Sequence, residues 1–261
     1  SMALAELDSI RTVGTIDYTD MMERFSRWCM HGEYTPFGEV FDIGTATSRA
    51  LMNYAKGIAP LESGGKTEWD NGNGSLMRIL PVCLYLFERQ KKVCTSENES
   101  IYMIHAVSAL THAHVRSQMA CGIYYFLVKA ILEEEGSLEK RLQKGMERAY
   151  QYYRQNLSNH RELENYKRLA DLSEFKETPK EGIKSSGYVV DTLEAAVWCL
   201  LHSHSYKETV LMAVNLGEDT DTIGAVAGGL AGLYYKEEGI PQEWTQVLQR
   251  REWIEEVLQG I

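Results

Sequence analysis

The pattern that most constrains the fold is helical periodicity, which recurs along most of the chain. Strict alternation of apolar and polar residues, the pattern of a half-buried strand, is nearly absent, and only five prolines occur in 261 residues. In the segment 18–30, for example, Met21, Met22, Phe25 and Trp28 lie at helical spacing. We therefore expect an all-α protein with about ten helices.

Helices are expected where apolar residues recur at this spacing. The segments are 18–30, 45–54, 76–88, 99–111, 117–134, 138–155, 191–202, 206–215 and 220–235, with a last pair within 241–258. Pro81 lies inside one of them and indicates either a kink or a later helix start. Residues 156–184 are polar and weakly patterned. Because no linker, low-complexity tract or fixed-period repeat interrupts the chain, we expect a single domain over residues 1–261.

Composition excludes several classes of protein. A net charge of −10 offers no basic field for nucleic acid, so no nucleic-acid partner is expected. No apolar run is long enough to cross a bilayer and no signal peptide is present, so no membrane partner is expected. The five cysteines, at positions 29, 83, 94, 121 and 199, form no Cys-x-x-Cys pair. This usage favours reduced thiols and a cytoplasmic location.

The segment 217–232 changes character abruptly. Four polar residues, 218–221, are followed by a run of small and apolar residues. We expect a tight turn at the start and a helix capped by Asp219 or Thr220. Glycines recur at every fourth position of this helix, at 224, 228 and 232, so a neighbouring element is expected to pack very close to one face.

The acids of this segment have two interpretations. Asp219, Asp221 and a threonine hydroxyl at the helix start are hard oxygen ligands of the kind that bind Mg²⁺, Mn²⁺ or Ca²⁺. Two carboxylates ahead of a buried helix repel each other unless a cation lies between them. The alternative is a plain N-cap followed by an acid in the first turn.

A second unusual segment begins with Asn71-Gly72-Asn73-Gly74 and leads into a helix. The two Asn-Gly pairs predict positive φ angles and exposed backbone N–H groups. Such a turn at a helix N-terminus could cradle an anion, or it could be a plain surface turn with Ser75 as N-cap.

Two further segments could contact a ligand. His112 and His114 form a His-x-His pair, which either binds a transition metal or, as we favour, makes hydrogen bonds. Residues 185–192 place small side chains beside Tyr188, which suits a sugar or a base. The alternative for this segment is a turn capped by Asp191 or Thr192.

Taken together and in this order, these segments resemble the ADP-ribosylglycohydrolase family over residues 15–236. The matching motifs are Asn73-Gly74-Ser75-Leu76-Met77-Arg78, Thr111-His112-Ala113-His114, Gly187-Tyr188-Val189-Val190-Asp191-Thr192-Leu193-Glu194-Ala195-Ala196 and Asp219-Thr220-Asp221-Thr222-Ile223. The last motif, with its Gly/Ala helix, is the most diagnostic.

The resemblance implies a compact orthogonal helix bundle that holds two Mg²⁺ or Mn²⁺ ions in a cleft. It implies that Asp219, Asp221 and Thr222 are metal ligands and that Asp219 and Asp221 are catalytic. The residues that it assigns to ADP-ribose are Asn73, Gly74, Ser75, Met77, His112, Gly187, Tyr188 and Val189. The implied activity is hydrolysis of the bond between ADP-ribose and a protein side chain by water that the metal activates. The expected partners are therefore ADP-ribose or ADP-ribosylated protein.

The sequence departs from the family pattern at its N-terminus. Members normally carry a Gly-Asp-x-x-Gly segment and a Thr-Asp-Asp-Thr/Ser motif that supply the opposite metal ligands, and neither occurs here. Residues 1–6 resemble the helix that follows these motifs, and Glu218 replaces a glycine of many members. Asp8, Asp17 and Asp70 are the acids nearest the gap or a matching loop. Three interpretations follow: an active hydrolase with repositioned ligands, a truncated or catalytically impaired ADP-ribose-binding chain, or a structural protein.

Overall fold

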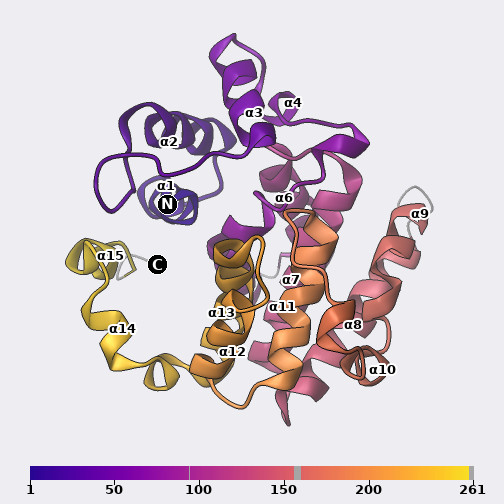
Figure 1. Ribbon diagram of the computed structural model, residues 1–261. Helices are drawn as coiled ribbons and strands as arrows, with labels where there is room; N and C mark the ends of the chain where they lie inside the picture. Colours follow the sequence, from indigo (N-terminus) through magenta and orange to yellow (C-terminus); the bar gives the residue numbers. More distant parts are fainter. Residues whose placement is uncertain (94, 156–159, 259–261) are drawn as a thin grey trace. The chain divides into compact units, whose positions relative to one another are not determined.

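The computed structural model describes residues 1–93, 95–155 and 160–258, and this part of the chain is all-α (Figure 1). It contains fifteen α-helices and five 3₁₀ helices, with no strand among the described residues beyond an isolated bridge between Gly65 and His112. The all-α prediction is confirmed. Cys94 and residues 156–159 of the weakly patterned segment lie outside the described residues. The chain divides into two compact units: unit 1 is Ser1–His114 with Thr245–Ile261, and unit 2 is Val115–Trp244.

Unit 1 is built around the first two helices. Its helices are α1 (Met2–Val13), α2 (Tyr18–His31), α3 (Thr45–Ala55), α4 (Pro60–Ser63), η1 (Glu68–Asp70), η2 (Leu76–Arg78), α5 (Leu80–Val93), α6 (Glu97–Ala109) and α15 (Arg251–Leu258). Helix α1 packs against α2, α5 and α15. The apolar stripe of α2 is buried as its spacing predicts, with Met21, Met22, Phe25 and Trp28 in the core.

The region around Pro81 resolves one of the open alternatives. Residues Leu76–Arg78 form the short helix η2, and α5 begins only at Leu80. Pro81 therefore lies in the first turn of α5, where a missing N–H costs no helical hydrogen bond. The later helix start is correct and no kink is needed.

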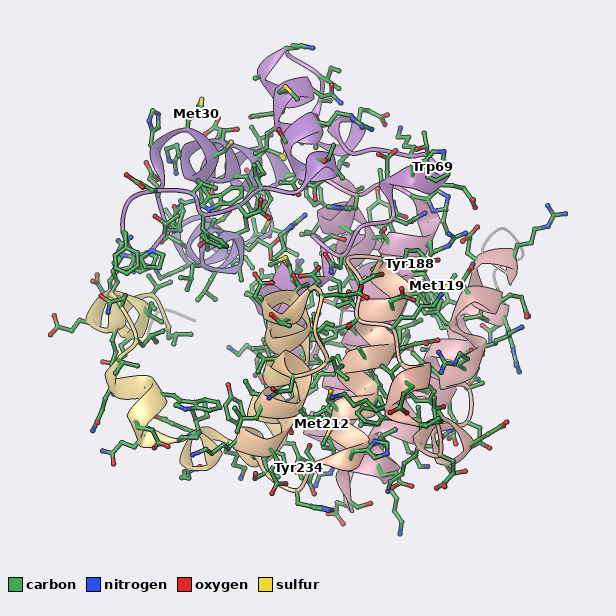
Figure 2. All side chains as sticks on the ribbon, in the orientation of Figure 1. Met30, Trp69, Met119, Tyr188, Met212 and Tyr234 are labelled. Atoms are coloured by element: carbon green, nitrogen blue, oxygen red, sulfur yellow. The ribbon has the colours of Figure 1, made fainter. Side chains whose placement is uncertain are left out.

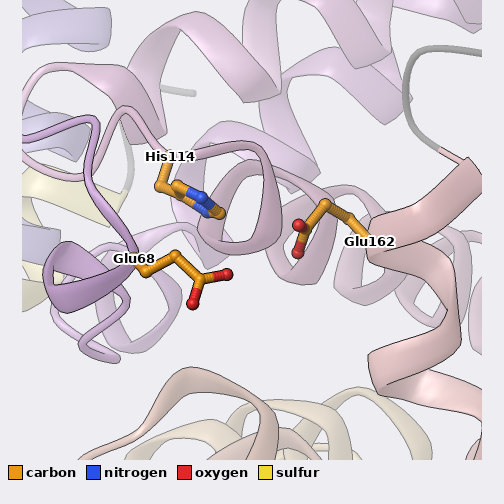
Figure 3. A group of neighbouring side chains, drawn as sticks. All are labelled: Glu68, His114 and Glu162. Carbon is orange, nitrogen blue, oxygen red and sulfur yellow. The ribbon is translucent and has the colours of Figure 1, made fainter.

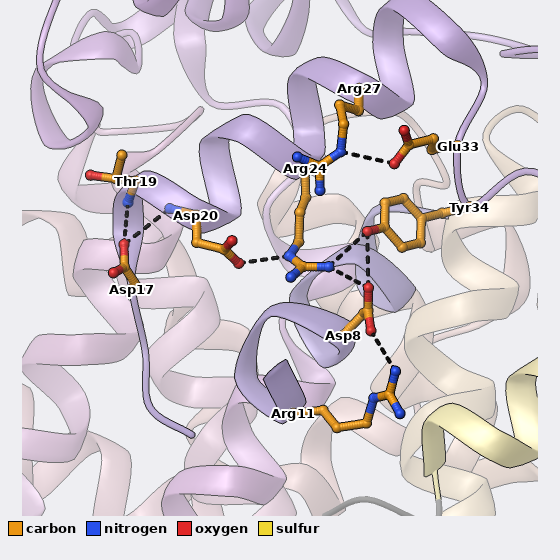
Figure 4. A network of polar contacts seen from close by, with 9 residues as sticks. All are labelled: Asp8, Arg11, Asp17, Thr19, Asp20, Arg24, Arg27, Glu33 and Tyr34. Carbon is orange, nitrogen blue, oxygen red and sulfur yellow. Dashed lines mark hydrogen bonds and ion pairs between the residues drawn. The ribbon is translucent and has the colours of Figure 1, made fainter. Parts of the chain in front are cut away.

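A polar network ties α1, α2 and the following loop together (Figure 4). Arg24 on α2 pairs with Asp8 on α1, donates to Asp20 Oδ2 at 2.6 Å, and donates to the Tyr34 hydroxyl at 3.0 Å. The ring of Tyr34 lies 5.9 Å from that of Trp253 on α15. This network therefore joins the first part of unit 1 to its C-terminal helix.

Unit 2 is organised around one helix that is buried over most of its length. Its helices are α7 (Val115–Glu133), α8 (Leu138–Arg154), α9 (His160–Leu163), η3 (Glu164–Leu169), α10 (Leu172–Lys176), η4 (Lys180–Gly182), α11 (Val189–His202), α12 (Tyr206–Val214), α13 (Thr220–Tyr235) and η5 (Glu237–Gly239). Helix α7 packs against α8, α11 and α13 (Figure 1). It buries Tyr124, Tyr125 and Phe126, and α8 adds Tyr153, so these aromatic residues belong to the core. The remaining helix, α14 (Gln242–Gln246), runs across the boundary of the units in the chain.

The glycine face of α13 packs against α12, as the sequence predicts. A Cβ atom at Gly224 would lie 3.3 Å from Val214 Cγ1, and one at Gly228 would lie 3.4 Å from Val210 Cγ2. Larger side chains at these positions would hold the two helices apart, so the small residues set their spacing.

The count of about ten helices was too low, because several helices are too short to show a period. The helices α4, α9, α10 and α14 have only four or five residues each. None of the helices in the described part of the chain has the length and apolar content of a membrane span. Among the same residues no disulfide is found at Cys29, Cys83, Cys121 or Cys199.

Candidate functional site

In unit 1 the Asn73–Met77 loop is anchored to the end of α6. Asn73 and Ser75 are buried, whereas Met77 is 41% exposed. Ser75 precedes η2 without forming a side-chain cap; its Oγ accepts a hydrogen bond from Ser108 Oγ at 2.9 Å instead. Ser108 is a residue of α6, so its hydrogen bond ties the loop to a helix that is distant in the sequence.

The positive φ angles expected at the two Asn-Gly pairs are not found. Neither Gly72 nor Gly74 is among the glycines with positive φ. Gly74 is required for a different reason: a Cβ there would lie 2.8 Å from Cε1 of His112 and 3.2 Å from Thr47 Oγ1. The missing side chain allows the imidazole to lie directly against the loop, so the structure brings two of the expected ligand-binding residues together.

His112 is a buried, neutral imidazole. Its Nδ1 lies 2.8 Å from Thr111 Oγ1, and its side chain is among the most buried polar groups, at 2% exposure. Burial lowers the pKa of His112 to about 3, and the charge of Arg78 adds to this effect. The ring therefore carries no charge at neutral pH.

Beneath this histidine lies a buried ion pair that sequence reasoning missed. Arg78 pairs with Glu6 of α1, and the side chains are 2% and 0% exposed. Arg78 Nη2 also donates to Val107 O at 3.1 Å and to Thr111 Oγ1 at 2.9 Å. Burial raises the pKa of Glu6 to about 7, although Arg78 opposes the shift. No local pattern marks this pair, since its members are 72 positions apart.

The three acids nearest the missing motifs all have structural partners within unit 1. Asp8 pairs with Arg24 and Asp17 caps α2. The Asp70 carboxylate accepts from Thr67 N at 3.0 Å, from Thr67 Oγ1 at 2.6 Å and from Arg49 Nη1 at 2.9 Å. Burial alone would raise the pKa of Asp70, but these hydrogen bonds hold it below its ordinary value.

In unit 2 the start of α13 carries the predicted metal ligands. Asp219 occupies the N-cap position but makes no side-chain cap hydrogen bond, Asp221 is exposed in the first turn, and Thr222 is buried. The turn before them holds Gly217 at φ 93° and Glu218 at φ 53°. The left-handed conformation of Glu218 explains why glycine suits this position.

The segment before α11 lies beside these acids. Asp219 N donates to Ser185 O at 3.0 Å, and a Cβ at Gly187 would lie 3.3 Å from Asp219 Oδ2. The structure thus brings together Gly187 and Asp219, which sequence reasoning assigned to ADP-ribose and to metal.

The alternative interpretation, with Asp191 or Thr192 as the cap of α11, is wrong. The N-cap is Tyr188, half-buried and labelled in Figure 2, and Val189 is the first helical residue and is buried. Asp191 instead accepts from Ser186 Oγ at 2.6 Å. Ser186 Oγ also accepts from Tyr188 N at 3.2 Å. Ser186 thus supplies the hydrogen bonds of the turn before the helix, and α11 begins at Val189, two residues before Asp191.

Glu68, His114 and Glu162 are drawn in Figure 3. Glu68 and His114 belong to unit 1, whereas Glu162 belongs to unit 2, where Arg116 Nε donates to its Oε2 at 2.7 Å. No metal site is assigned to the three, since they are divided between the units.

The all-α fold agrees with the comparisons. The profile of the ADP-ribosylglycohydrolase family matches residues 1–261, and the chain belongs to this family. It is 32% identical over 256 residues to ADP-ribosylarginine hydrolase Tri1 of Serratia proteamaculans, which covers 97% of this chain and 63% of that protein. It is 31% identical to the protein of the same name from Pseudomonas putida, covering 100% of this chain and 64% of that protein.

More distant relatives and a solved structure belong to the same family. The ADP-ribosyl-[dinitrogen reductase] glycohydrolase of Rhodospirillum rubrum is 26% identical, covering 96% of this chain and 72% of that protein. A solved structure titled ADP-ribosylglycohydrolase-related protein complex matches with a TM-score of 0.74 and 29% identity, covering 99% of this chain and 78% of that chain. The chain spans slightly less than two thirds of the length of the two arginine hydrolases.

Proposed function

We propose that this chain removes ADP-ribose from modified arginine side chains by hydrolysis. The observation that carries the proposal is the close approach of Asp219, at the start of α13, to the small-residue segment at Gly187, in a chain that belongs to the ADP-ribosylglycohydrolase family. Arginine is the proposed attachment site because two relatives with more than 30% identity are named ADP-ribosylarginine hydrolases.

The residues at the start of α13 fit Mg²⁺ or Mn²⁺ as part of a coordination shell. Asp219, Asp221 and Thr222 provide hard oxygen donors within one helical turn. Mg²⁺ usually keeps several waters and takes only one or two carboxylates, so a small set of protein ligands suits it. When bound, such a metal would supply Lewis-acid activation of the water that hydrolyses the glycosidic bond.

The ADP-ribose contacts are proposed separately for each unit. In unit 1 the loop residues Asn73, Gly74, Ser75 and Met77 would approach the ligand, with His112 behind Gly74. In unit 2 the bare backbone at Gly187, followed by Tyr188 and Val189, would lie beside the ligand next to Asp219. At Gly187 the lack of a side chain allows close approach of a ligand to the backbone, whereas at Gly74 it makes room for the imidazole of His112.

The test is release of ADP-ribose from a protein ADP-ribosylated on arginine, with and without Mg²⁺. We expect Mg²⁺-dependent release, and Asp221→Asn should lower the rate by about 100-fold or more, since even residues behind a metal ligand contribute about 10–100-fold. Asp221 is the better choice for substitution because its side chain is exposed. Glu218→Gln, which changes a neighbouring exposed acid, is the matched control and should leave the rate unchanged.

A folded protein without Mg²⁺-dependent release would contradict the hydrolase proposal. ADP-ribose binding should then be measured by titration calorimetry, because binding without turnover would identify a chain that recognises ADP-ribose without cleaving it.

We also propose a cytoplasmic location, which the absence of disulfides at the four described cysteines supports.

A further inference from the structure

A chain of hydrogen bonds in unit 1 fixes the protons around His112. It begins at Glu6, passes through Arg78 and Thr111, and ends at His112. A guanidinium group can only donate hydrogen bonds. Thr111 Oγ1 must therefore be the acceptor in its 2.9 Å contact with Arg78 Nη2.

The hydroxyl proton of Thr111 then has one destination. A threonine hydroxyl has a single proton, and in a helix its usual acceptor is the carbonyl four residues earlier. Among the described residues Thr111 makes no such bond to Val107 O, which accepts from Arg78 Nη2 at 3.1 Å instead. Thr111 is fully buried, so water cannot take the proton. The remaining partner is His112 Nδ1, at 2.8 Å.

This arrangement decides the tautomer of His112. Because burial lowers the pKa of His112 to about 3, the ring is neutral and carries a single N–H. Nδ1 accepts from Thr111, so the proton must be on Nε2. This nitrogen faces Gly74, where an added Cβ would lie 3.3 Å away. In the described part of the chain Nε2 itself makes no hydrogen bond.

We propose that Thr111, oriented by Arg78, is a positioning residue that fixes His112 as the Nε2–H tautomer, so that His112 donates to an oxygen atom of the ligand beside Gly74. The identity of that ligand as ADP-ribose rests on the proposed function; the tautomer does not. An Nε2–H group cannot bind a metal without losing its proton, so this assignment favours hydrogen bonding over metal binding for the His-x-His pair.

The first test is ¹⁵N NMR of the full chain labelled on histidine. The signals of His112 are assigned by their loss in His112→Gln. The wild-type protein should show a protonated Nε2 and an unprotonated, hydrogen-bonded Nδ1. Thr111→Val keeps the shape of the side chain and removes the hydroxyl, and it should shift the Nδ1 signal or populate the second tautomer. Thr111→Ser restores the hydroxyl and should restore the wild-type pattern.

The second test is titration of each protein with ADP-ribose by calorimetry. Thr111→Val should weaken binding by about 10-fold, the value of one well-formed hydrogen bond, while Thr111→Ser stays close to wild type. Circular dichroism and the signals of the other six of the seven histidines show whether the variants fold.

A wild-type protein with the proton on Nδ1, or a Thr111→Val variant with the unchanged wild-type pattern, would overturn the inference. Unaltered affinity in a Thr111→Val variant with altered signals would also overturn the role of His112 as ligand donor. If neither the wild type nor any variant binds ADP-ribose while the NMR signals are as expected, the proposed function fails and the positioning of His112 by Thr111 stands.

Discussion

The buried pair of Glu6 and Arg78 leads to an unusual prediction about stability. Replacing both residues should lower the unfolding free energy less than replacing either one alone. Arg78→Met breaks the ion pair with Glu6 and removes two further hydrogen bonds, to Val107 O and Thr111 Oγ1. A hydrogen bond from a charged donor contributes about 1.5 kcal/mol, so the variant should lose about 3 kcal/mol of unfolding free energy.

Glu6 itself lowers stability at neutral pH. Its pKa is raised by burial from 4.5 to about 7, so the unfolded chain releases this proton first as the pH rises. The favourable contribution of protonated Glu6 is therefore fully present below pH about 4.5 and is lost as the pH rises, so that about 3 kcal/mol of stability has been lost at pH 7. Combining Glu6→Leu with Arg78→Met removes this cost. The double variant should return to within about 1 kcal/mol of wild type at pH 7, in line with other buried pairs replaced by apolar residues.

Urea unfolding followed by circular dichroism at pH 7 and pH 5 tests this reasoning. At pH 5 the cost of Glu6 has fallen to about 1 kcal/mol, so the advantage of the double variant over Arg78→Met should shrink from about 3 to about 1 kcal/mol. Glu6→Leu alone should lose about 3–5 kcal/mol at both pH values, because the guanidinium cannot shed its charge. A double variant as unstable as Arg78→Met at pH 7, or an advantage that grows on acidification, would refute the argument.

Three further predictions concern other positions. Glu218→Gly should raise the unfolding free energy by about 0.5–1 kcal/mol, since it relieves a φ of 53°; thermal unfolding would show an unchanged or lower midpoint if the turn is unstrained. Gly228→Ala should be neutral or slightly stabilising because its contact at 3.4 Å is ordinary, whereas Gly228→Leu should cost about 1–3 kcal/mol in urea unfolding; equal effects of the two would argue against close packing on α12. His112→Gln should flatten the pH dependence of stability between about pH 6 and 4 by up to about 1.4 kcal/mol per pH unit, because the depressed pKa of His112 makes the unfolded state bind the extra proton and stability fall on acidification; an unchanged slope would contradict a neutral buried ring.

The parts of the fold that follow local rules were predictable from the sequence. Helix α13 begins and ends where its polar start and apolar run place it, at Thr220 and Tyr235. Its glycine face faces a close neighbour, and the buried stripe of α2 matches its period. Each of these features depends on residues within a few turns of one another.

Features that depend on distant residues could not be predicted. Arg78 was visible only as the end of a loop motif, yet its partner Glu6 lies on the first helix. Gly74 was expected to serve a turn, but its neighbour is the imidazole of His112, from the turn that follows α6. Periodicity and cap signals carry no information about which segments meet in space.

The discontinuity of unit 1 has a consequence for synthesis on the ribosome. Helix α15 belongs to the same unit as α1, buries Val257 and places Trp253 against Tyr34, but it is translated after all of unit 2. At about 5–20 residues per second, synthesis of helix α15 is complete roughly 10 to 45 seconds after that of α2, and the surfaces of α1 and α2 stay uncovered by it until then. Unit 2 is continuous and can fold as soon as it emerges. The exposed apolar surface of the waiting segment is therefore the part of the nascent chain that a chaperone would be expected to bind.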